Sequence, residues 1–473
     1  MKIKKLFINT IGCQMNVYDS EKVASKMAFL GYVQTADLEE ADLVFLNTCT
    51  IREKAEQKAF SFLGRLNRLK QKKPGILVVV GGCVAQQEGE AILKRVPAVD
   101  LVIGTGAVSR IGEHVGRIEA ERCRIVDVEM PETLSEGRGE TFGGPVKENR
   151  VSAFVKIMTG CANYCTYCVV PSVRGTEISR RPENIVAEIE SLVRSGVREI
   201  SLLGQNVNRY GKKQGFCSFA ELLGIVDKID GVARIRFTTS HPKDLSEELM
   251  EAFAKYGRLC NHIHLPVQSG SNRVLKRMNR GYTREIYLEK VKMLRKINPE
   301  IAITTDIIVG FPGETEEDFE QTADLIERIS FDSLFAFKYS DRPMAPARKF
   351  PGKIPESVKS ERLKKVLTLQ ETRTIILHRS LIGQVQEVLV EGLSKKHRAK
   401  REKSSKIQWT GRTTGNIVVN LADGVSTGSA GAENLTGRLV GVKIEKALPH
   451  SIWGKPVYVE PETRGLKGET YAA

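Results

Sequence analysis

Three cysteines of this chain each stand directly after a short apolar run, and their spacing restricts the fold more than any other feature. Cys13, Cys49 and Cys83 recur at intervals of 36 and 34 residues. That interval is about the length of one strand, turn and helix, so a chain of such units returns to the same edge of a parallel sheet each time. Ligands of open parallel sheets bind just outside the carboxyl ends of the strands. The spacing therefore predicts that the three thiols converge at one edge of a sheet.

The segment around these cysteines has the pattern of strands alternating with helices. The apolar runs are Leu6 to Asn9, Leu43 to Leu46 and Ile76 to Val80. Continuous runs of this kind are typical of parallel strands that are covered on both faces. Gly12, Gly81 and Gly82 stand beside the cysteines and allow the backbone to approach a bound group closely. We therefore predict an α/β protein whose residues 1–125 form a doubly wound parallel sheet domain.

A stretch rich in Gly, Pro, Glu and Arg follows, and it predicts a linker over residues 126–150. Beyond it, six strand candidates alternate with helical patterns, at residues 153–158, 200–203, 235–238, 263–267, 303–309 and 334–339. One helical pattern has Pro182 near its start and Gly196 just past its end, as helices commonly do. Six successive units predict a central partial (β/α)6 barrel over residues 151–376.

The last region is rich in strand candidates, at residues 385–390, 407–410, 417–421 and 439–444. They predict a small antiparallel β-barrel over residues 377–448, with a C-terminal tail over residues 449–473. A basic segment precedes the second candidate and contains Lys395, Lys396, Arg398, Lys400 and Arg401. A run of this kind is either a solvated loop or a contact for nucleic acid.

The net charge restricts the class of partner, and the lack of a long apolar run restricts the compartment. The formal net charge is +15, which favours a polyanionic partner because Lys and Arg neutralise phosphates, although charge alone does not separate RNA from DNA. No apolar run approaches the roughly 18 residues that span a bilayer, and no cleavage-site pattern follows Met1, so we expect a cytoplasmic protein without a membrane segment. No heptad pattern indicates oligomers, and a monomer is the default expectation.

A second group of cysteines has the spacing Cys-x3-Cys-x2-Cys at the end of the first strand candidate of the barrel. Its members are Cys161, Cys165 and Cys168. A zinc site usually has four protein ligands, whereas a cubane iron-sulfur cluster held by three thiolates keeps one iron open. No fourth Cys or His follows closely in the sequence, so we predict a cluster with an open iron. The other cysteines, Cys123, Cys217 and Cys260, are expected to be buried thiols, with a fourth ligand to either triad as the alternative.

This spacing resembles the signature of the radical S-adenosylmethionine (SAM) superfamily, in which SAM chelates the open iron. The resemblance implies that Tyr167 packs near the adenine, that Gln205 and Asn206 hold the amino group, and that backbone at Gly310 approaches the adenine. Ser240 and Gln268 also stand at ends of strand candidates, where active-site residues of parallel barrels gather, so we predict that they bind SAM as well. For each of these residues a polar loop role is the alternative. His262 and His264 alternate along a strand candidate and are expected to pack or hydrogen-bond inside the barrel.

Longer segments resemble the radical-SAM methylthiotransferases that act on N6-dimethylallyladenosine beside the anticodon of tRNA. The segments are Gly12 to Asn16, Asn47 to Lys54, Gly81 to Gln86, His264 to Gly270, Lys276 to Arg280 and Gly411 to Thr414. The resemblance implies a second [4Fe-4S] cluster on Cys13, Cys49 and Cys83, and a TRAM-like RNA-binding domain at the C-terminal end. Ser172 and the pair Met344-Ala345 depart from the family's pattern, which leaves local substrate contacts open.

The activity implied by this resemblance is methylthiolation of C2 of the base at tRNA position 37. SAM would serve as methyl donor and radical source, and an external electron donor and a sulfur source would be needed. The anticodon loop would present the adenine unstacked. One alternative is the same chemistry on threonylcarbamoyladenosine or on a protein side chain. The other is a non-catalytic iron-sulfur protein that binds RNA or transfers electrons.

Overall fold

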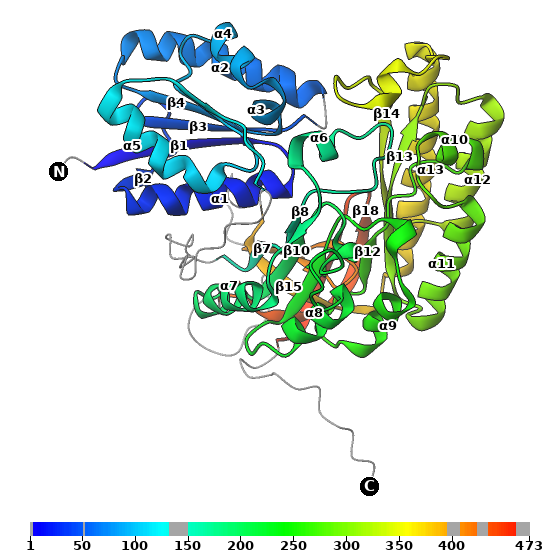
Figure 1. Ribbon diagram of the computed structural model, residues 1–473. Coiled ribbons are helices and arrows are strands. Elements are labelled where there is room, and N and C mark those ends of the chain that lie inside the picture. The colour runs from blue at the N-terminus through cyan, green and yellow to red at the C-terminus, as the bar shows by residue number, and fades with distance from the viewer. Residues whose placement is uncertain (1–2, 51–52, 132–149, 395–406, 423–433, 460–473) are drawn as a thin grey trace.

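The computed structural model describes residues 3–50, 53–131, 150–394, 407–422 and 434–459. Figure 1 shows three successive parts along the chain: an N-terminal domain in blue and cyan, a large barrel domain in green and yellow, and a C-terminal domain that contains β15 and β18. No described helix combines the length and the apolar character that crossing a bilayer requires.

The N-terminal domain is a six-stranded sheet in which every pair of neighbouring strands is parallel, in the order β2-β1-β3-β4-β5-β6. The strands are β1 Lys4–Ile11, β2 Tyr32–Gln34, β3 Leu43–Thr48, β4 Leu77–Gly82, β5 Leu101–Ile103 and β6 Ile125–Asp127. The three predicted strands are β1, β3 and β4. The other three have only three residues each, which is too short to leave a periodic pattern in the sequence.

Helices cover both faces of this sheet, as the doubly wound prediction requires. The helices are α1 Gln14–Phe29, α2 Glu53–Lys72, α3 Cys83–Glu88, α4 Glu90–Arg95 and α5 Ile111–Glu121, with a short η1 turn Val108–Arg110. Side chains of β3 alternate between two cores. Phe45 packs in the core that holds residues of α1 and α5, while Val44 and Leu46 pack in the core that holds residues of α2 and α4. The chain order reverses between β1 and β3, and ligands of such sheets bind at this switch point.

The central domain contains the six predicted strands in two three-stranded parallel sheets, β7-β10-β11 and β12-β13-β14. These strands are β7 Ser152–Lys156, β10 Glu199–Leu203, β11 Arg234–Phe237, β12 His262–His264, β13 Ala302–Val309 and β14 Ser333–Lys338. A single bridge between Ile235 and Leu259 continues the hydrogen bonding from β11 toward β12. The domain is therefore a partial (β/α)6 barrel, as predicted.

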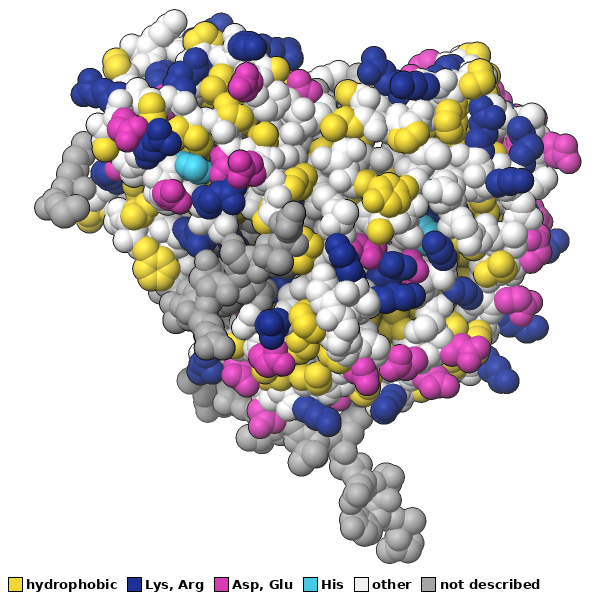
Figure 2. All heavy atoms as spheres, viewed as in Figure 1, with side chains coloured by type: hydrophobic (Ala, Val, Ile, Leu, Met, Phe, Trp, Pro, Cys, Tyr) yellow, Lys and Arg dark blue, Asp and Glu magenta, His cyan; other side chains and the backbone are white. Residues whose placement is uncertain are grey.

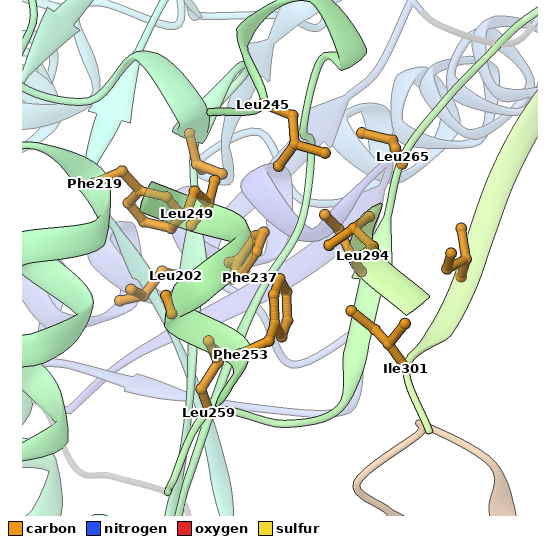
Figure 3. Close-up of a cluster of buried hydrophobic side chains, with 14 of the residues drawn as sticks. Leu202, Phe219, Phe237, Leu245, Leu249, Phe253, Leu259, Leu265, Leu294 and Ile301 are labelled. Atoms are coloured by element: carbon orange, nitrogen blue, oxygen red, sulfur yellow. The ribbon is translucent and has the colours of Figure 1, made fainter. Parts of the chain in front are cut away.

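Helices surround these strands and share one hydrophobic core with them. The helices and turns are α6 Val170–Arg174, α7 Pro182–Arg194, η2 Val207–Arg209, α8 Phe219–Asp227, η3 Pro242–Asp244, α9 Glu247–Lys255, α10 Asn272–Arg277, α11 Arg284–Ile297, α12 Glu316–Ile329, η4 Pro346–Lys349 and α13 Glu356–Ser380. Figure 3 shows Phe219 of α8, Phe237 of β11 and Phe253 of α9 pointing toward one another. The predicted helix after Pro182 is α7, and Gly196 beyond its end has a φ of 95°.

One predicted strand of the barrel is divided in the structure. The candidate at residues 153–158 becomes β7 and a separate β8, Met158–Thr159, which pairs antiparallel with β9, Ile178–Ser179. Ile157 between β7 and β8 still bonds to the neighbouring strand through Leu203. The chain leaves the parallel sheet before Cys161, and the Cys165 sulfur of the second triad lies 3.8 Å from His241, which follows the carboxyl end of β11.

The C-terminal domain is a closed five-stranded barrel in the order β15-β16-β17-β19-β18. Its strands are β15 Val385–Leu393, β16 Gln408–Thr413, β17 Val418–Ala422, β18 Leu439–Leu448 and β19 Ser451–Val459. Strand β19 lies in the segment expected to be a tail, and it pairs parallel with β17, so the barrel is not wholly antiparallel as predicted. Gly454 and Pro456 weakened the strand pattern there, since both residues are rare within strands.

Two buried arginines of β11 hold this domain against the central barrel. Arg234 donates to the carbonyl of Arg412 at 2.6 Å, and Arg236 donates to the carbonyls of Thr413 at 2.7 Å and Thr414 at 3.0 Å. The segment from Gly411 to Thr414, which resembles the methylthiotransferase family, therefore contributes a docking contact between two domains.

Candidate metal and cofactor centre

The first cysteine triad lies at the carboxyl ends of three neighbouring strands. Cys13 follows β1 and caps the N-terminus of α1, Cys49 follows β3, and Cys83 follows β4 as the first residue of α3. The Cys49 thiol hydrogen-bonds to both Cys13 and Cys83. The structure thus brings together three thiols that are far apart in the sequence.

Hydrogen bonding within this triad favours thiolates at two of its members. The bond from Cys49 lowers the pKa of Cys13 to about 6 and the pKa of Cys83 to about 7, and the nearby Arg174 guanidinium acts in the same direction. The same bonds raise the pKa of Cys49. Because thiolates are the metal-binding form of cysteine, the lowered pKa values suit Cys13 and Cys83 to metal ligation, whereas Cys49 would have to lose its proton on binding.

Polar side chains beside the triad hold the strand ends in place. Asn16 donates to Asn47 at 2.8 Å, and Asn47 donates back to the Asn16 carbonyl at 2.8 Å, with both side chains buried. Gly82 has a φ of 92°, and a Cβ there would overlap the Thr48 carbonyl. These contacts explain why asparagine and glycine stand next to the cysteines.

The second triad lies in the loop between β8 and α6. Cys165 is buried, and its thiol interacts electrostatically with Cys161 and Cys168, whose pKa values burial raises to about 11 and about 12. The Val170 N–H donates to the Cys168 sulfur at 3.4 Å. The thiols of each triad therefore interact, although among the described residues no group of three His, Cys, Asp or Glu side chains is spaced to hold a single metal ion.

Two further side chains contact the second triad, and neither was among the predicted site residues. Arg280 is buried and places its Nη1 3.3 Å from the Cys165 sulfur and 3.2 Å from the Tyr167 hydroxyl. The Nε2 atom of His241 lies 3.8 Å from the same sulfur. Burial, followed by the charge of Arg280, lowers the pKa of His241 to about 2, so this imidazole is neutral. Two sequence features could have indicated these residues: Arg280 ends a segment that resembles the family, and His241 is next to the predicted site residue Ser240.

Four of the predicted SAM residues carry buried polar atoms that have no hydrogen-bond partner among the described residues. These atoms are Oε1 of Gln205, Oδ1 of Asn206, Oγ of Ser240 and Oε1 of Gln268. Buried polar atoms nearly always have a partner in folded proteins. Four exceptions at the ends of three barrel strands therefore fit a site that receives a polar molecule.

The other contacts of these residues orient the free atoms. Asn206 donates from its Nδ2 atom to Asp244 at 2.7 Å, which leaves its Oδ1 atom free. Gln268 has a φ of 73° and is bound through its backbone to Asp306 and Ile308. The Asn206 side chain and the Gln268 backbone are thus held, while the side-chain oxygen of each residue stays available.

Tyr167 and the turn at Gly310 contribute to one apolar cluster. Tyr167 packs against the cluster that contains Phe311 and Tyr339, and a flat apolar surface of this kind suits an adenine. Gly310 has a φ of 71°, and its N–H already donates to Glu314 at 2.6 Å. The predicted adenine contacts of Tyr167 and of Gly310 stay predictions.

The barrel histidines hydrogen-bond inside the domain, as expected. Nε2 of His262 lies 3.2 Å from the Thr304 hydroxyl, and Nδ1 of His264 lies 3.0 Å from the same atom. The five predicted RNA-binding residues Lys395, Lys396, Arg398, Lys400 and Arg401 lie outside the described residues.

Full-length relatives show which family the chain belongs to. A protein of Desulfosudis oleivorans named tRNA-2-methylthio-N(6)-dimethylallyladenosine synthase is 52% identical over 471 residues, which cover 100% of both chains. Proteins of the same name from Syntrophus aciditrophicus and Geobacter metallireducens are 49% and 50% identical, and the matches cover 96% of this chain and 94% and 98% of theirs. This chain belongs to the tRNA-2-methylthio-N(6)-dimethylallyladenosine synthase family.

Regional matches agree with the three parts of this synthase-family chain. The Radical SAM superfamily matches residues 155–326, the uncharacterized protein family UPF0004 matches residues 5–104, and the TRAM domain matches residues 379–457. The radical SAM methyltransferase TsrM of Kitasatospora setae, solved with cobalamin and a [4Fe-4S] cluster bound, aligns with a TM-score of 0.55 at 15% identity over 74% of each chain. That likeness shows a shared fold.

Cys123, Cys217 and Cys260 stand apart from the two triads. All three are free thiols, Cys260 is buried, and Cys123 packs against the core that contains residues of α1 and α5. Cys217 packs against the barrel core. The expectation of a buried thiol is confirmed for Cys260, whereas Cys123 and Cys217 are only partly buried.

Proposed function

We propose that this chain inserts a methylthio group at C2 of N6-dimethylallyladenosine at position 37 of tRNA, next to the anticodon. The observation that carries the proposal is the pairing of two thiol triads with a nearby group of partnerless polar atoms. Three sulfurs converge at the switch point of the N-terminal sheet, and three more lie above the barrel strands whose ends carry the four free oxygens.

The residues present fit the cofactors of this reaction. Cys13, Cys49 and Cys83 would hold an auxiliary [4Fe-4S] cluster, and Cys161, Cys165 and Cys168 would hold the cluster that binds SAM. When bound, these groups supply the radical that activates an aromatic C–H bond and the sulfur and methyl group that replace its hydrogen. Side-chain acids and bases alone do not activate such a carbon.

The chain's own residues orient the cofactors and keep water out. Gln205, Asn206, Ser240 and Gln268 would bind the polar groups of SAM. The guanidinium of Arg280 would neutralise charge at the Cys165 sulfur, to which Nη1 lies 3.3 Å away. Burial of this arginine and of His241 excludes water from the sulfur and so protects reactive species from quenching.

The experiment that tests the proposal combines cluster content with product analysis. The intact chain, reconstituted anaerobically, is expected to bind twice the iron and sulfide of a variant in which Cys161, Cys165 and Cys168 are all alanine. The intact protein should convert tRNA that carries N6-dimethylallyladenosine, and nucleoside mass spectrometry should detect the 2-methylthio product. A product on threonylcarbamoyladenosine would favour that substrate instead. If a sample that contains both clusters forms no 5′-deoxyadenosine from SAM, the result would favour a non-catalytic protein.

The remaining partners belong to the same proposal. The C-terminal barrel would contact the anticodon loop, and an external electron donor and a sulfur source would serve the reaction. A monomeric chain in the cytoplasm stays the prediction from the sequence.

A further inference from the structure

A residue of the barrel domain lies beside the first cysteine triad, which belongs to the N-terminal domain. Helix α6 begins two residues after Cys168 and ends at Arg174, and Figure 1 shows it between the N-terminal domain and the barrel. Its residue Val173 packs in one apolar cluster with Val169, Ala345 and Cys83. The short helix thus connects the loop of the second triad to a thiol of the first.

Arg174 lies at this junction and is only 6% exposed. Its Nη1 atom donates to the Asp19 carboxylate of α1 at 3.0 Å. The guanidinium also acts electrostatically on the Cys83 and Cys13 thiols, whose pKa values it lowers. Its Nη2 atom is buried and has no hydrogen-bond partner among the described residues.

The local charges favour an anionic group beside Arg174. Lys156 of β7 lies 3.8 Å from the Asp19 carboxylate, so one buried carboxylate faces two cations. A buried guanidinium with a free N–H is costly unless an acceptor meets it. Sulfur atoms of a cluster with three thiolate ligands are acceptors of this kind, and hydrogen bonds to them and the net charge around them set cluster potentials.

We propose that Arg174 is a positioning residue of the auxiliary site, where it supplies a hydrogen bond and a positive charge to the sulfur atoms of the cluster held by Cys13, Cys49 and Cys83. The barrel domain thereby raises the reduction potential of a cluster whose ligands all belong to the N-terminal domain. The inference rests on the proposed function, because it takes the first triad to hold a cluster.

The test measures the auxiliary cluster by itself in the full-length chain. Replacing Cys161, Cys165 and Cys168 with alanine gives a parent with only the first triad. Arg174→Gln and Asp19→Asn are added to this parent one at a time, and the midpoint potential is measured by redox titration followed by electron paramagnetic resonance. Arg174→Gln should shift the potential to more negative values. Asp19→Asn should shift it to more positive values, because it removes a negative charge and leaves the guanidinium.

A control and a conservative variant separate this role from domain docking. Arg150 forms an ion pair with Glu21 of α1 at 3.1 Å and donates to the Ser152 carbonyl at 2.7 Å, so Arg150→Gln should leave the potential unchanged. Arg174→Lys should give a potential between those of the parent and Arg174→Gln, and it serves where the glutamine variant loses its cluster.

The outcomes distinguish this inference from the proposed function. If the parent binds iron and sulfide but Arg174→Gln and Arg174→Lys retain its potential, or if Asp19→Asn shifts the potential in the same direction as Arg174→Gln, the role of Arg174 is wrong and the proposed function stands. If the parent binds no cluster at all, both the two-cluster assignment and the role of Arg174 are overturned.

Discussion

At the scale of single residues, the barrel mouth is defined by polar atoms that the protein itself does not satisfy. Ser240 illustrates this, since its buried hydroxyl has no partner among the described residues. Ser269 nearby is also fully buried, but its hydroxyl contacts Thr322 at 3.3 Å and accepts from the Ser271 N–H at 3.2 Å. The Ser240 hydroxyl is therefore available to a ligand, whereas the Ser269 hydroxyl is used by contacts within the fold.

This contrast predicts the effect of removing each hydroxyl. Ser240→Ala should weaken SAM binding by about threefold to tenfold, the value of one neutral hydrogen bond, while the free energy of unfolding changes little. Ser269→Ala should lower the free energy of unfolding by about 1–2 kcal/mol and have the smaller effect on SAM binding. Equilibrium dialysis of the reconstituted protein and denaturant unfolding measure the two quantities. Equal SAM affinity in the Ser240 variant and the wild-type chain would remove Ser240 from the site.

Another residue-scale property is the neutral state of His262. Burial, with a further contribution from the charge of Arg236, lowers its pKa to about 3. An unfolded chain binds a proton at this histidine below about pH 6.5 and the folded chain does not, so stability falls as the pH decreases from about 6.5 toward 3. Between pH 7 and pH 5 this loss is about 2 kcal/mol.

His262→Gln should remove that dependence. The variant keeps a polar group near Thr304 but has no titrating ring, so its unfolding free energy should fall by about 2 kcal/mol less than that of the wild-type chain between pH 7 and pH 5. Urea unfolding at the two pH values gives the comparison. A variant with the same pH dependence as the wild-type protein would contradict a neutral, buried His262.

At the scale of elements, two helices fasten the N-terminal domain to the barrel. Glu188 of α7 is 2% exposed and accepts from Arg180 at 2.6 Å. From α1, Lys22 lies 3.4 Å from its carboxylate and the Tyr18 hydroxyl donates to it at 3.4 Å. A buried carboxylate that joins cations of two domains holds the two cluster sites in one arrangement.

Removing this carboxylate should separate radical formation from sulfur insertion. Glu188→Ala removes the anion between the buried Arg180 and the partly buried Lys22, which costs about 3–5 kcal/mol, and it should loosen the contact between α1 and α7. We expect SAM cleavage to continue while methylthio product per 5′-deoxyadenosine falls. Mass spectrometry of both products measures the ratio. Glu190→Ala, an exposed change on the same helix, is the control, and equal ratios in the two variants would show that docking does not govern the reaction.

At the scale of the whole molecule, the question is which part of the surface carries the excess positive charge. On the face shown in Figure 2, Lys and Arg side chains of the N-terminal and central domains are interspersed with Asp and Glu. The densest basic run of the sequence is the segment between β15 and β16, which lies outside the described residues. The prediction that this segment contacts RNA rests on its charge, because counterion release depends on the number of phosphates that Lys and Arg neutralise.

Replacing Lys395, Lys396, Arg398, Lys400 and Arg401 with alanine should weaken tRNA binding and flatten its salt dependence. If each side chain meets one phosphate of the single-stranded loop, the slope of log affinity against log salt should become shallower by about 3.5. Fluorescence anisotropy with labelled tRNA at several salt concentrations measures the slope. The control removes five exposed charges from the N-terminal domain, at Lys58, Arg65, Arg68, Lys94 and Arg117. Equal slopes for the two variants would exclude the segment from the RNA contact.

Much of the fold followed from local patterns, and the failures were local as well. Long apolar runs identified β1, β3, β4 and the barrel strands because burial on both faces requires them. The three-residue strands β2, β5 and β6 have no pattern of their own, and β19 was hidden by Gly454 and Pro456. These strands are stable because a neighbouring strand supplies hydrogen bonds to them.

The sequence by itself determined the chemistry, since thiols at strand ends and three cysteines within eight positions are local features. Only the tertiary structure decided what surrounds them. Arg174 meets Asp19 across 155 residues, Arg280 meets Cys165 across 115, and His241 meets Cys165 across 76. Contacts of that kind leave no periodic pattern in the sequence, because they depend on how distant segments pack. The local sequence around each residue does not indicate its partner.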